Sequence, residues 1–343
     1  MKKKEVFFWV ATSNPFNSIY FQIKYLSNLL SKQFAITPII INPETKNLDL
    51  IFKDINSNKK LIFWHYGGFD SYLRKIDKSS KNVVFIYHNI TPARFFITTE
   101  PMVALRSLLG RLQILFLSKE NIWITMSDYN KRELEYFGFK EIILCYNIIK
   151  LLQTEAITKT DIPSILYVGR LAQNKNIHSL IKQVDILAKE YKHNMRFVIV
   201  GSAKRNTYFE KKTINLLNKL VMNKNLEVVI RNHIDDFELN RYYKESWLYV
   251  SMSLHEGFGV PVCESILNGT PAIYLESGGQ ESILNNFGKI SKLESDVFHK
   301  YIYNLIMSKK QRDKLLSQQY RIVKKYTYPE INKIVYNAYR RFL

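Results

Sequence analysis

Short apolar runs rich in β-branched residues alternate along the chain with stretches in which apolar residues recur every three or four positions. The second half shows this most clearly, and β-strands are expected there at 164–168, 195–200, 226–230, 247–252 and 271–275. Helices are expected between them, for example over 177–188 and 214–221. Strands that alternate with helices form a parallel sheet covered on both faces. This half therefore predicts a doubly wound α/β domain.

The first half repeats this alternation less regularly. Strands are expected at 6–11, 36–41, 61–64, 83–87, 122–126 and 142–145, and helices over 19–30 and 127–137, the second with Ser127 as N-cap. The polar stretch 153–163 is the expected linker. We therefore predict an N-terminal domain over 1–155, a C-terminal domain over 156–325 and a last helix over 326–343 that crosses back to the first domain. Two doubly wound Rossmann-like domains would face a cleft, where ligands of such sheets bind.

Length and composition exclude several classes of protein. A chain of 343 residues fits two domains, and a hydrophobic content of 46% excludes a disordered chain. Two cysteines, Cys145 and Cys263, offer neither a disulfide framework nor paired zinc ligands, which fits a reducing compartment. The first apolar run, 6–11, is shorter than the ~7–15 residues of a secretory signal, and no run approaches the ~18 of a membrane span. The sequence thus predicts a cytoplasmic protein.

The charge of the chain is strongly positive. The formal net charge is +20, and residues 309–343 alone hold ten basic and two acidic side chains. Such a field attracts polyanions, which include nucleic acid, an anionic membrane surface and a phosphorylated substrate, although a solvated lysine-rich surface would give the same sum. A basic nucleic-acid-binding protein is one alternative, but the sequence holds no helix-turn-helix, zinc-finger or RNP pattern. The net charge alone does not indicate which of these partners the protein binds.

One candidate anion site follows the first strand of the second half. The run Val168-Gly169-Arg170 ends that strand, and Lys175 lies five residues further on, where the next helix is expected. A helix N-terminus offers N–H groups and a favourable dipole to an anion. Arg170 and Lys175 would add two cations suited to a diphosphate, although solvated surface charge explains the same residues.

The segment from Ser253 to Glu264, SLHEGFGVPVCE, contains the most informative set of candidate ligand-binding residues. Glu256 follows an expected strand, and Gly257 and Gly259 let the backbone approach a ligand because they lack a Cβ atom. Pro261 suits the first turn of a helix, on which Glu264 then lies. Two carboxylates beside a helix N-terminus can accept hydrogen bonds from the hydroxyls of a sugar or ribose. The simpler alternative is that Glu256 favours the helix dipole and Glu264 is an exposed helix residue.

The segment resembles glycosyltransferase family 4, retaining enzymes of the GT-B fold, whose signature is two glutamates separated by seven residues within Gly-Phe-Gly-x-Pro. The Val168–Arg170 run with Lys175 is similar to the phosphate-binding element of that family. The stretch 270–281 with Gly278 and Gly279 resembles its closing glycine turn. The resemblance is strong over about 164–290. It implies a GT-B protein that transfers a sugar without a metal or other cofactor.

The resemblance also implies roles for individual residues. Glu264 would bind the ribose, Glu256 the donor sugar, and Arg170 and Lys175 the diphosphate. Backbone groups would also help to bind the nucleotide and its base, and they would come from Gly257, Phe258, Gly259, Val260, Ile234, Gly278 and Gly279. His88, in a His-Asn-Ile-Thr-Pro motif after a strand of the first half, would lie near the transferred sugar. The loop 12–18 departs from the family, because Asn14-Pro15-Phe16 stands where many members carry a glycine pair.

These implications define an expected activity and expected partners. The chain would move a hexose-type sugar, with retention, from a nucleoside-diphosphate sugar to a glycan or lipid-linked glycan in cell-surface polysaccharide assembly. Its basic C-terminal region would also meet an anionic membrane on the cytoplasmic side, and no nucleic-acid partner is expected. A sugar epimerase or phosphorylase of the same fold is a further alternative, because fold alone does not determine the reaction.

Overall fold

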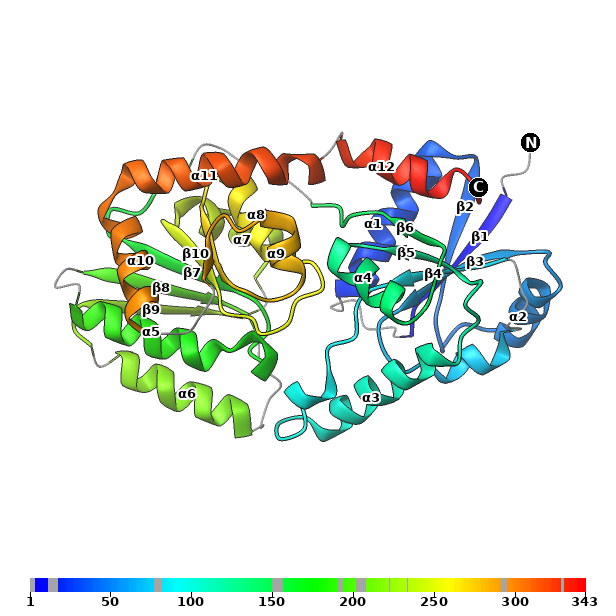
Figure 1. Cartoon of the computed structure of the whole chain (residues 1–343), viewed down its shortest axis with the longest axis horizontal. Helices are drawn as coiled ribbons and strands as arrows, with labels where there is room; N and C mark the ends of the chain where they lie inside the picture. Colours follow the sequence, from blue (N-terminus) through cyan, green and yellow to red (C-terminus); the bar gives the residue numbers. More distant parts are fainter. Residues whose placement is uncertain are drawn as a thin grey trace. The chain divides into compact units, whose positions relative to one another are not determined.

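The structure is a computed structural model that describes residues 4–11, 18–76, 82–149, 157–190, 194–201, 208–221, 223–232, 234–290, 295–327 and 330–343 (Figure 1). The chain divides into two compact units. The N unit comprises 1–97, 101–148 and 328–343, and the C unit comprises 98–100 and 149–327. The change of unit after residue 148 thus lies a few residues before the expected boundary at 155. Nothing in the sequence pattern singles out 98–100 as part of the C unit.

The N unit is built on one sheet of six parallel strands. Their order is β2-β1-β3-β4-β5-β6, and their bounds are β1 Lys4–Trp9, β2 Ile36–Ile41, β3 Leu61–Tyr66, β4 Val83–Tyr87, β5 Ile122–Thr125 and β6 Ile142–Leu144. Every residue of β3 and β4 is buried, as expected of central strands covered on both faces. Trp9 and Trp64 stack in this core, and both indole N–H groups donate to the buried carboxylate of Asp70.

Helices cover both faces of this sheet (Figure 1). They are α1 Ser18–Gln33, α2 Leu48–Asn56, α3 Pro101–Leu115, α4 Asp128–Tyr136 and α12 Glu330–Tyr339, with short 3₁₀ turns η1 Ser71–Lys75 and η2 Ala93–Phe95. The hydroxyl of Ser127 accepts a hydrogen bond from the amide of Asn130 at 3.1 Å, which confirms Ser127 as an N-cap. The sequence analysis did not predict α2 and α3.

The last helix, α12, packs within the N unit against residues from the start of the chain. Tyr336 stacks on Phe34 with ring centroids 5.2 Å apart, and Tyr339 lies against Phe63 at 5.0 Å. Ile331, Val335 and Ala338 are buried, as their helical spacing predicts. This part of the basic C-terminal region is therefore structural.

The C unit has a second parallel sheet with the order β12-β11-β10-β7-β8-β9. Its strands are β7 Ser164–Val168, β8 Met195–Val200, β9 Leu226–Arg231, β10 Leu248–Ser251, β11 Ala272–Leu275 and β12 Lys289–Ile290. Its helices are α5 Ile177–Glu190, α6 Tyr208–Val221, α7 Asp236–Glu245, α8 Val260–Leu267, α9 Gly279–Leu284, α10 Ser295–Met307 and α11 Lys309–Val323, with turns η3 Gln173–Lys175 and η4 Lys324–Tyr326. The strands β7 to β11 match the expected ones to within about one residue at each end, and β12 was not predicted.

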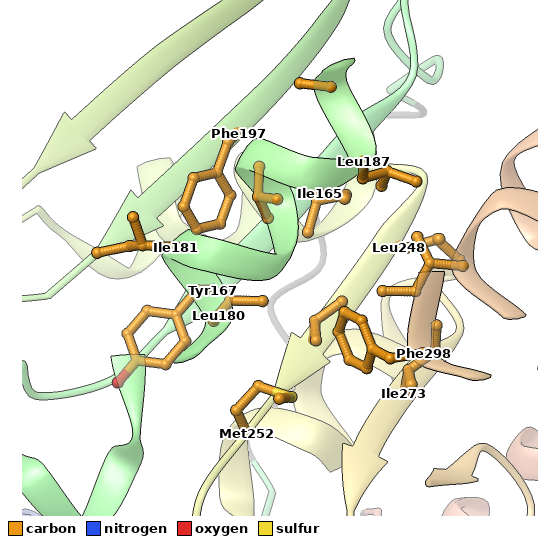
Figure 2. Packing of buried hydrophobic residues seen from close by; sticks show 14 of the residues in the cluster. Ile165, Tyr167, Leu180, Ile181, Leu187, Phe197, Leu248, Met252, Ile273 and Phe298 are labelled. Carbon is orange, nitrogen blue, oxygen red and sulfur yellow. The ribbon is translucent and has the colours of Figure 1, made fainter. Parts of the chain in front are cut away.

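The apolar face of α5 forms much of the core of this unit. Figure 2 shows Leu180, Ile181 and Leu187 of α5 close to Ile165 and Phe197 of the sheet. The predicted apolar positions of α5 are buried, because a helix that covers a parallel sheet must turn its apolar side toward the strands. Two doubly wound α/β sheets are thus present, which confirms the predicted fold class. Within the described residues, no helix is long and apolar enough to cross a membrane.

Candidate active site

The candidate residues of the C unit lie where its strand order reverses. β7 pairs with β8 on one side and with β10 on the other, so the chain leaves these two neighbouring strands in opposite directions around the sheet. Ligands of doubly wound sheets bind at the carboxyl ends of strands at this point. The loops that follow β7 and β10 carry Arg170, Lys175 and Glu256. A hydrogen bond of 2.8 Å from the Leu254 amide to the Asn174 carbonyl ties the two loops together.

Lys175 and Glu256 form an ion pair between these loops. The ammonium Nζ contacts the carboxylate Oε1, and the two side chains are only 23% and 15% exposed. Limited exposure reduces solvent screening of the pair. Lys175 is the last residue of η3. Asn176, which has a left-handed conformation, separates it from the start of α5. The sequence analysis placed both residues in the site but did not predict that they pair.

Arg170 lies on the same loop after β7 as Lys175, and Ile234 follows a different strand, β9. The Arg170 side chain is exposed, and its carbonyl accepts a hydrogen bond from the Tyr167 hydroxyl at 3.0 Å. Ile234 is half-buried in the loop between β9 and α7. Its neighbour His233 lies outside the described residues, as does the loop 12–17.

Two glycine turns pack backbone against backbone beside Glu256. The Gly279 amide donates to the Glu256 carbonyl at 2.7 Å, and a Cβ atom on Gly279 would lie 2.6 Å from the Phe258 nitrogen. Gly259 is the N-cap of α8 with a φ of 98°, a left-handed conformation that favours glycine. The closing glycine turn, including Gly278, thus sets the position of the loop that carries Glu256.

Phe258 and Val260 flank Gly259 in different environments. The Phe258 side chain is 5% exposed and packs edge-on against Tyr326 at 5.4 Å, so only its main chain is available to a ligand. Val260 is half-buried and begins α8, with Pro261 in the first turn as predicted.

Glu264 is a half-buried residue of α8, which excludes the alternative of an exposed helix glutamate. Its Oε2 accepts a hydrogen bond of 2.8 Å from the Tyr243 hydroxyl. Burial raises the pKa of Glu264 to about 6, the hydrogen bond from Tyr243 opposes this rise, and the charge of Asp236 adds to it. Glu264 therefore titrates close to physiological pH.

Three buried tyrosines that the sequence analysis missed lie beneath these groups. The hydroxyls of Tyr167 and Tyr249 donate to the carbonyls of Arg170 and Val168, and that of Tyr243 donates to Glu264. Burial raises the pKa of each, and the charge of Glu256 or Glu264 contributes to each rise. We call Tyr167, Tyr243 and Tyr249 the tyrosine floor. With 22 tyrosines in the chain, a Tyr in an apolar run gave no signal of its own.

The N unit holds His88, which follows β4 as predicted. Nε2 of His88 lies 2.7 Å from Nδ1 of His65 in β3, and the two rings stack at 5.0 Å. Burial lowers the pKa of His88 to about 4, and burial together with His88 lowers that of His65 well below 6.5. Both rings are neutral near pH 7, so they can share one hydrogen bond and leave Nδ1 of His88 for another partner. The sequence analysis missed His65, although its place before Gly67-Gly68 at a strand end was a usable signal.

The described part of the chain holds no group of three or more His, Cys, Asp or Glu residues suited to a metal ion. The ammonium of Lys175 contacts the carboxylate of Glu256, and Arg170 lies on the same loop as Lys175.

The comparisons with known sequences agree with one another. The sequence profile of the family described as "Glycosyl transferases group 1" matches residues 152–321. The capsular polysaccharide biosynthesis glycosyltransferase CapH of Staphylococcus aureus is 29% identical over 100 residues, which are 29% of this chain and 28% of CapH. The mannosylfructose-phosphate synthase of Agrobacterium fabrum is 30% identical over 117 residues, 34% of this chain and 26% of that enzyme. The matched stretch thus spans about a quarter of the length of these relatives.

Solved structures resemble the chain over nearly its whole length. Sucrose-phosphate synthase of Thermosynechococcus elongatus has a TM-score of 0.75 at 16% identity, with 99% of each chain covered. HepE of Anabaena, solved in complex with UDP and glucose, has a TM-score of 0.66 at 14% identity, with 98% of each chain covered. At such identities these likenesses concern the fold, and they confirm the predicted GT-B fold.

Proposed function

We propose, because the chain belongs through residues 152–321 to the glycosyl transferases group 1 family, that it is a retaining glycosyltransferase whose donor is a nucleoside-diphosphate sugar. The observation that carries the proposal is the pairing of Lys175 with Glu256 at the point where the sheet order of the C unit reverses. A cation and a carboxylate there are suited to the two halves of such a donor, the diphosphate and the sugar hydroxyls. The complex of HepE with UDP and glucose supports the same class of ligand.

Each candidate residue has a role in this proposal. Arg170 and Lys175 bind the diphosphate, and Glu256 accepts hydrogen bonds from the sugar. Glu264 accepts them from the ribose. The main chain contributes at Gly257, Phe258, Gly259, Val260, Gly278 and Gly279, while Ile234 meets the base. The ion pair supports this division, because the Lys175 ammonium has three N–H donors and can bind Glu256 and a phosphate oxygen together.

The proposed reaction exchanges one bond at the anomeric carbon. The bond from this carbon to the leaving diphosphate oxygen breaks, and a bond to the acceptor hydroxyl oxygen forms on the same face. The leaving phosphate takes the proton of that hydroxyl. Negative charge grows on the diphosphate, where Arg170 and Lys175 stabilise it without a metal ion. His88, neutral near pH 7, acts as a hydrogen-bond partner of the sugar rather than as an acid.

The acceptor in this proposal is a glycan or a lipid-linked glycan in cell-surface polysaccharide assembly. The capsular role in the name of CapH supports this class. The basic side chains of α11 and η4, which include Lys310, Lys314 and Lys324, would favour a position at an anionic membrane on the cytoplasmic side.

The proposed function is tested by screening nucleotide sugars for protection against thermal unfolding. The stabilising donor is then incubated with lipid-linked and free glycan acceptors, and the anomeric configuration of the product is determined. We expect one class of nucleotide sugar to raise the Tm and the product to keep the anomeric configuration of the donor. Inversion would contradict the retaining mechanism. Stabilisation only by oligonucleotides, lost at high salt, would support the nucleic-acid alternative.

The role of Glu264 predicts a pH dependence of donor binding. Hydrogen bonds from ribose hydroxyls require the ionised carboxylate, whose pKa in the free protein is about 6. Affinity is therefore nearly complete at pH 7 and falls as the pH drops through 6, by about tenfold between pH 7 and pH 5. Calorimetry with a nucleotide sugar, whose phosphates stay ionised over this range, measures the effect.

Two variants test whether Glu264 is the group whose titration changes donor affinity. In Glu264→Gln the affinity should be lower and independent of pH from 5 to 7. Tyr243→Phe removes a hydrogen bond that favours the carboxylate, so its midpoint should move above pH 6. An unchanged pH profile in Glu264→Gln would show that another group is responsible.

A further inference from the structure

His65 and His88 form a pair of rings at the carboxyl ends of two neighbouring strands in the N unit. β3 and β4 pair in parallel with His65 opposite Ile86, and His88 follows directly after β4. Nδ1 of His65 lies 2.7 Å from Nε2 of His88, and the two ring planes differ by only 23°. His65 therefore occupies one ring nitrogen of His88, and Nδ1 of His88 is the ring nitrogen left for a ligand.

The main chain around His88 is also held firmly. The His88 amide donates to the Tyr66 carbonyl at 2.9 Å, which continues the pairing of β3 with β4 by one residue. Asn89 has a left-handed conformation with a φ of 69°, and its side-chain amide donates to the Glu133 carboxylate at 3.0 Å. With the main chain fixed on both sides, the hydrogen bond with His65 sets the remaining variable, which is the orientation of the His88 ring.

The second ring nitrogen of His65 indicates which ring donates this hydrogen bond. Burial lowers the pKa of both rings, so near pH 7 each is neutral and carries one proton. Nε2 of His65 is buried, and among the described residues it has no hydrogen-bond partner. If His88 donated through Nε2, the proton of His65 would lie on this buried nitrogen without an acceptor. Orphaned buried N–H groups are rarer in folded proteins than orphaned acceptors, so Nδ1 of His65 is the donor.

This arrangement places the proton of His88 on Nδ1, the nitrogen that remains for a ligand. We propose that His65 is a positioning residue that holds His88 in this Nδ1–H form, so that His88 donates a hydrogen bond to a hydroxyl oxygen of the transferred sugar. The inference rests on the proposed function, because it requires a sugar beside His88. An N–H group that meets the sugar needs an acceptor there, so a deoxy sugar without this hydroxyl should be a poor substrate.

NMR of isotope-labelled histidine nitrogens tests the proton positions in the full chain without any nucleotide sugar. The chemical shift of a ring nitrogen distinguishes a protonated from a bare nitrogen, and His65→Phe and His88→Phe assign the two residues by the loss of their signals. In the wild type we expect Nδ1 to be protonated and Nε2 to be bare in both rings. A protonated Nε2 on His88 would overturn the proposal.

Kinetics with the stabilising nucleotide sugar test the role of His65 in transfer. His65→Phe keeps a flat ring but has no N–H group, so kcat should fall by about tenfold to a hundredfold, the loss expected when a group near the reaction is misplaced. Affinity for the free nucleoside diphosphate, which lacks the sugar, should stay unchanged. His65→Asn carries an amide N–H close to the position of Nδ1 and should restore most of the lost kcat.

A matched control and a test of folding make the outcome decisive. His299 of α10 is likewise buried, with an Nε2 that has no partner among the described residues, so His299→Phe should change neither kcat nor the nitrogen shifts of His88. A His65→Phe protein that circular dichroism shows to be folded and that keeps the wild-type kcat would overturn the proposal. Absence of transfer by the wild type would overturn the proposed function, and with it the role toward the sugar, whereas the NMR result on the pair itself would stand.

Discussion

Replacing Lys175 by methionine is expected to lower kcat by about 10²–10³-fold, the loss typical of removing one preorganised group that stabilises developing charge. Methionine keeps much of the apolar length of the side chain but cannot neutralise a leaving diphosphate. The same change leaves the Glu256 carboxylate, only 15% exposed, without its cation. We therefore also expect the free energy of unfolding to fall by about 1–2 kcal/mol, less than for a fully buried pair because both side chains are partly solvated.

A double variant separates the two effects. Lys175→Met with Glu256→Gln removes both charges, so much of the lost stability should return while transfer remains low. Lys189→Met is the matched control for removal of an ion-paired lysine, because Lys189 pairs with Asp185 on the exposed side of α5. It should change neither stability nor kcat measurably. A Lys175→Met enzyme that keeps more than a tenth of the wild-type kcat at saturating donor would contradict the proposed role of Lys175.

The strands were the most predictable part of the fold. In a parallel sheet both faces are covered, so each strand is a short continuous apolar run, and β2, β4, β7 and β8 were predicted to the residue. Helix α3 was missed for a physical reason. It presents small residues to the core and large ones to solvent, so its burial does not follow its apolar pattern.

The candidate site was predicted where a motif places residues close together in the sequence. Glu256, Gly259, Pro261 and Glu264 lie within nine positions, and the helix start at Val260 fixes their arrangement. Contacts between distant segments were not predictable in this way. Neither the pairing of Lys175 with Glu256, 81 residues apart, nor the tyrosine floor leaves a local pattern, because each depends on strand order. His65 belongs to the same group, since it meets His88 only through the pairing of β3 with β4.

Gly279→Ala gives the sharpest test of the glycine turns, because helix propensity and packing predict opposite changes in the free energy of unfolding. Gly279 is the first residue of α9, where alanine would ordinarily stabilise a helix by up to about 1 kcal/mol. Here a Cβ atom would lie 2.5 Å from the Gly257 carbonyl carbon and 2.6 Å from the Phe258 nitrogen. Both are backbone atoms, so no change of rotamer relieves the overlap.

We therefore expect Gly279→Ala to lower the free energy of unfolding by about 3 kcal/mol, the upper end of overpacking costs. It should also weaken donor binding, because the Gly279 amide holds the Glu256 carbonyl at 2.7 Å and the turn must move to accept the methyl group. Gly68→Ala is the control for stability, since nothing lies within 4 Å of its Cβ position, and it should change stability by less than about 0.5 kcal/mol. Denaturant unfolding and calorimetry with the stabilising nucleotide sugar measure the two effects. A Gly279→Ala protein as stable as the wild type would mean that the turns do not pack this closely, and the proposed main-chain contribution of Gly278 and Gly279 would fall with it.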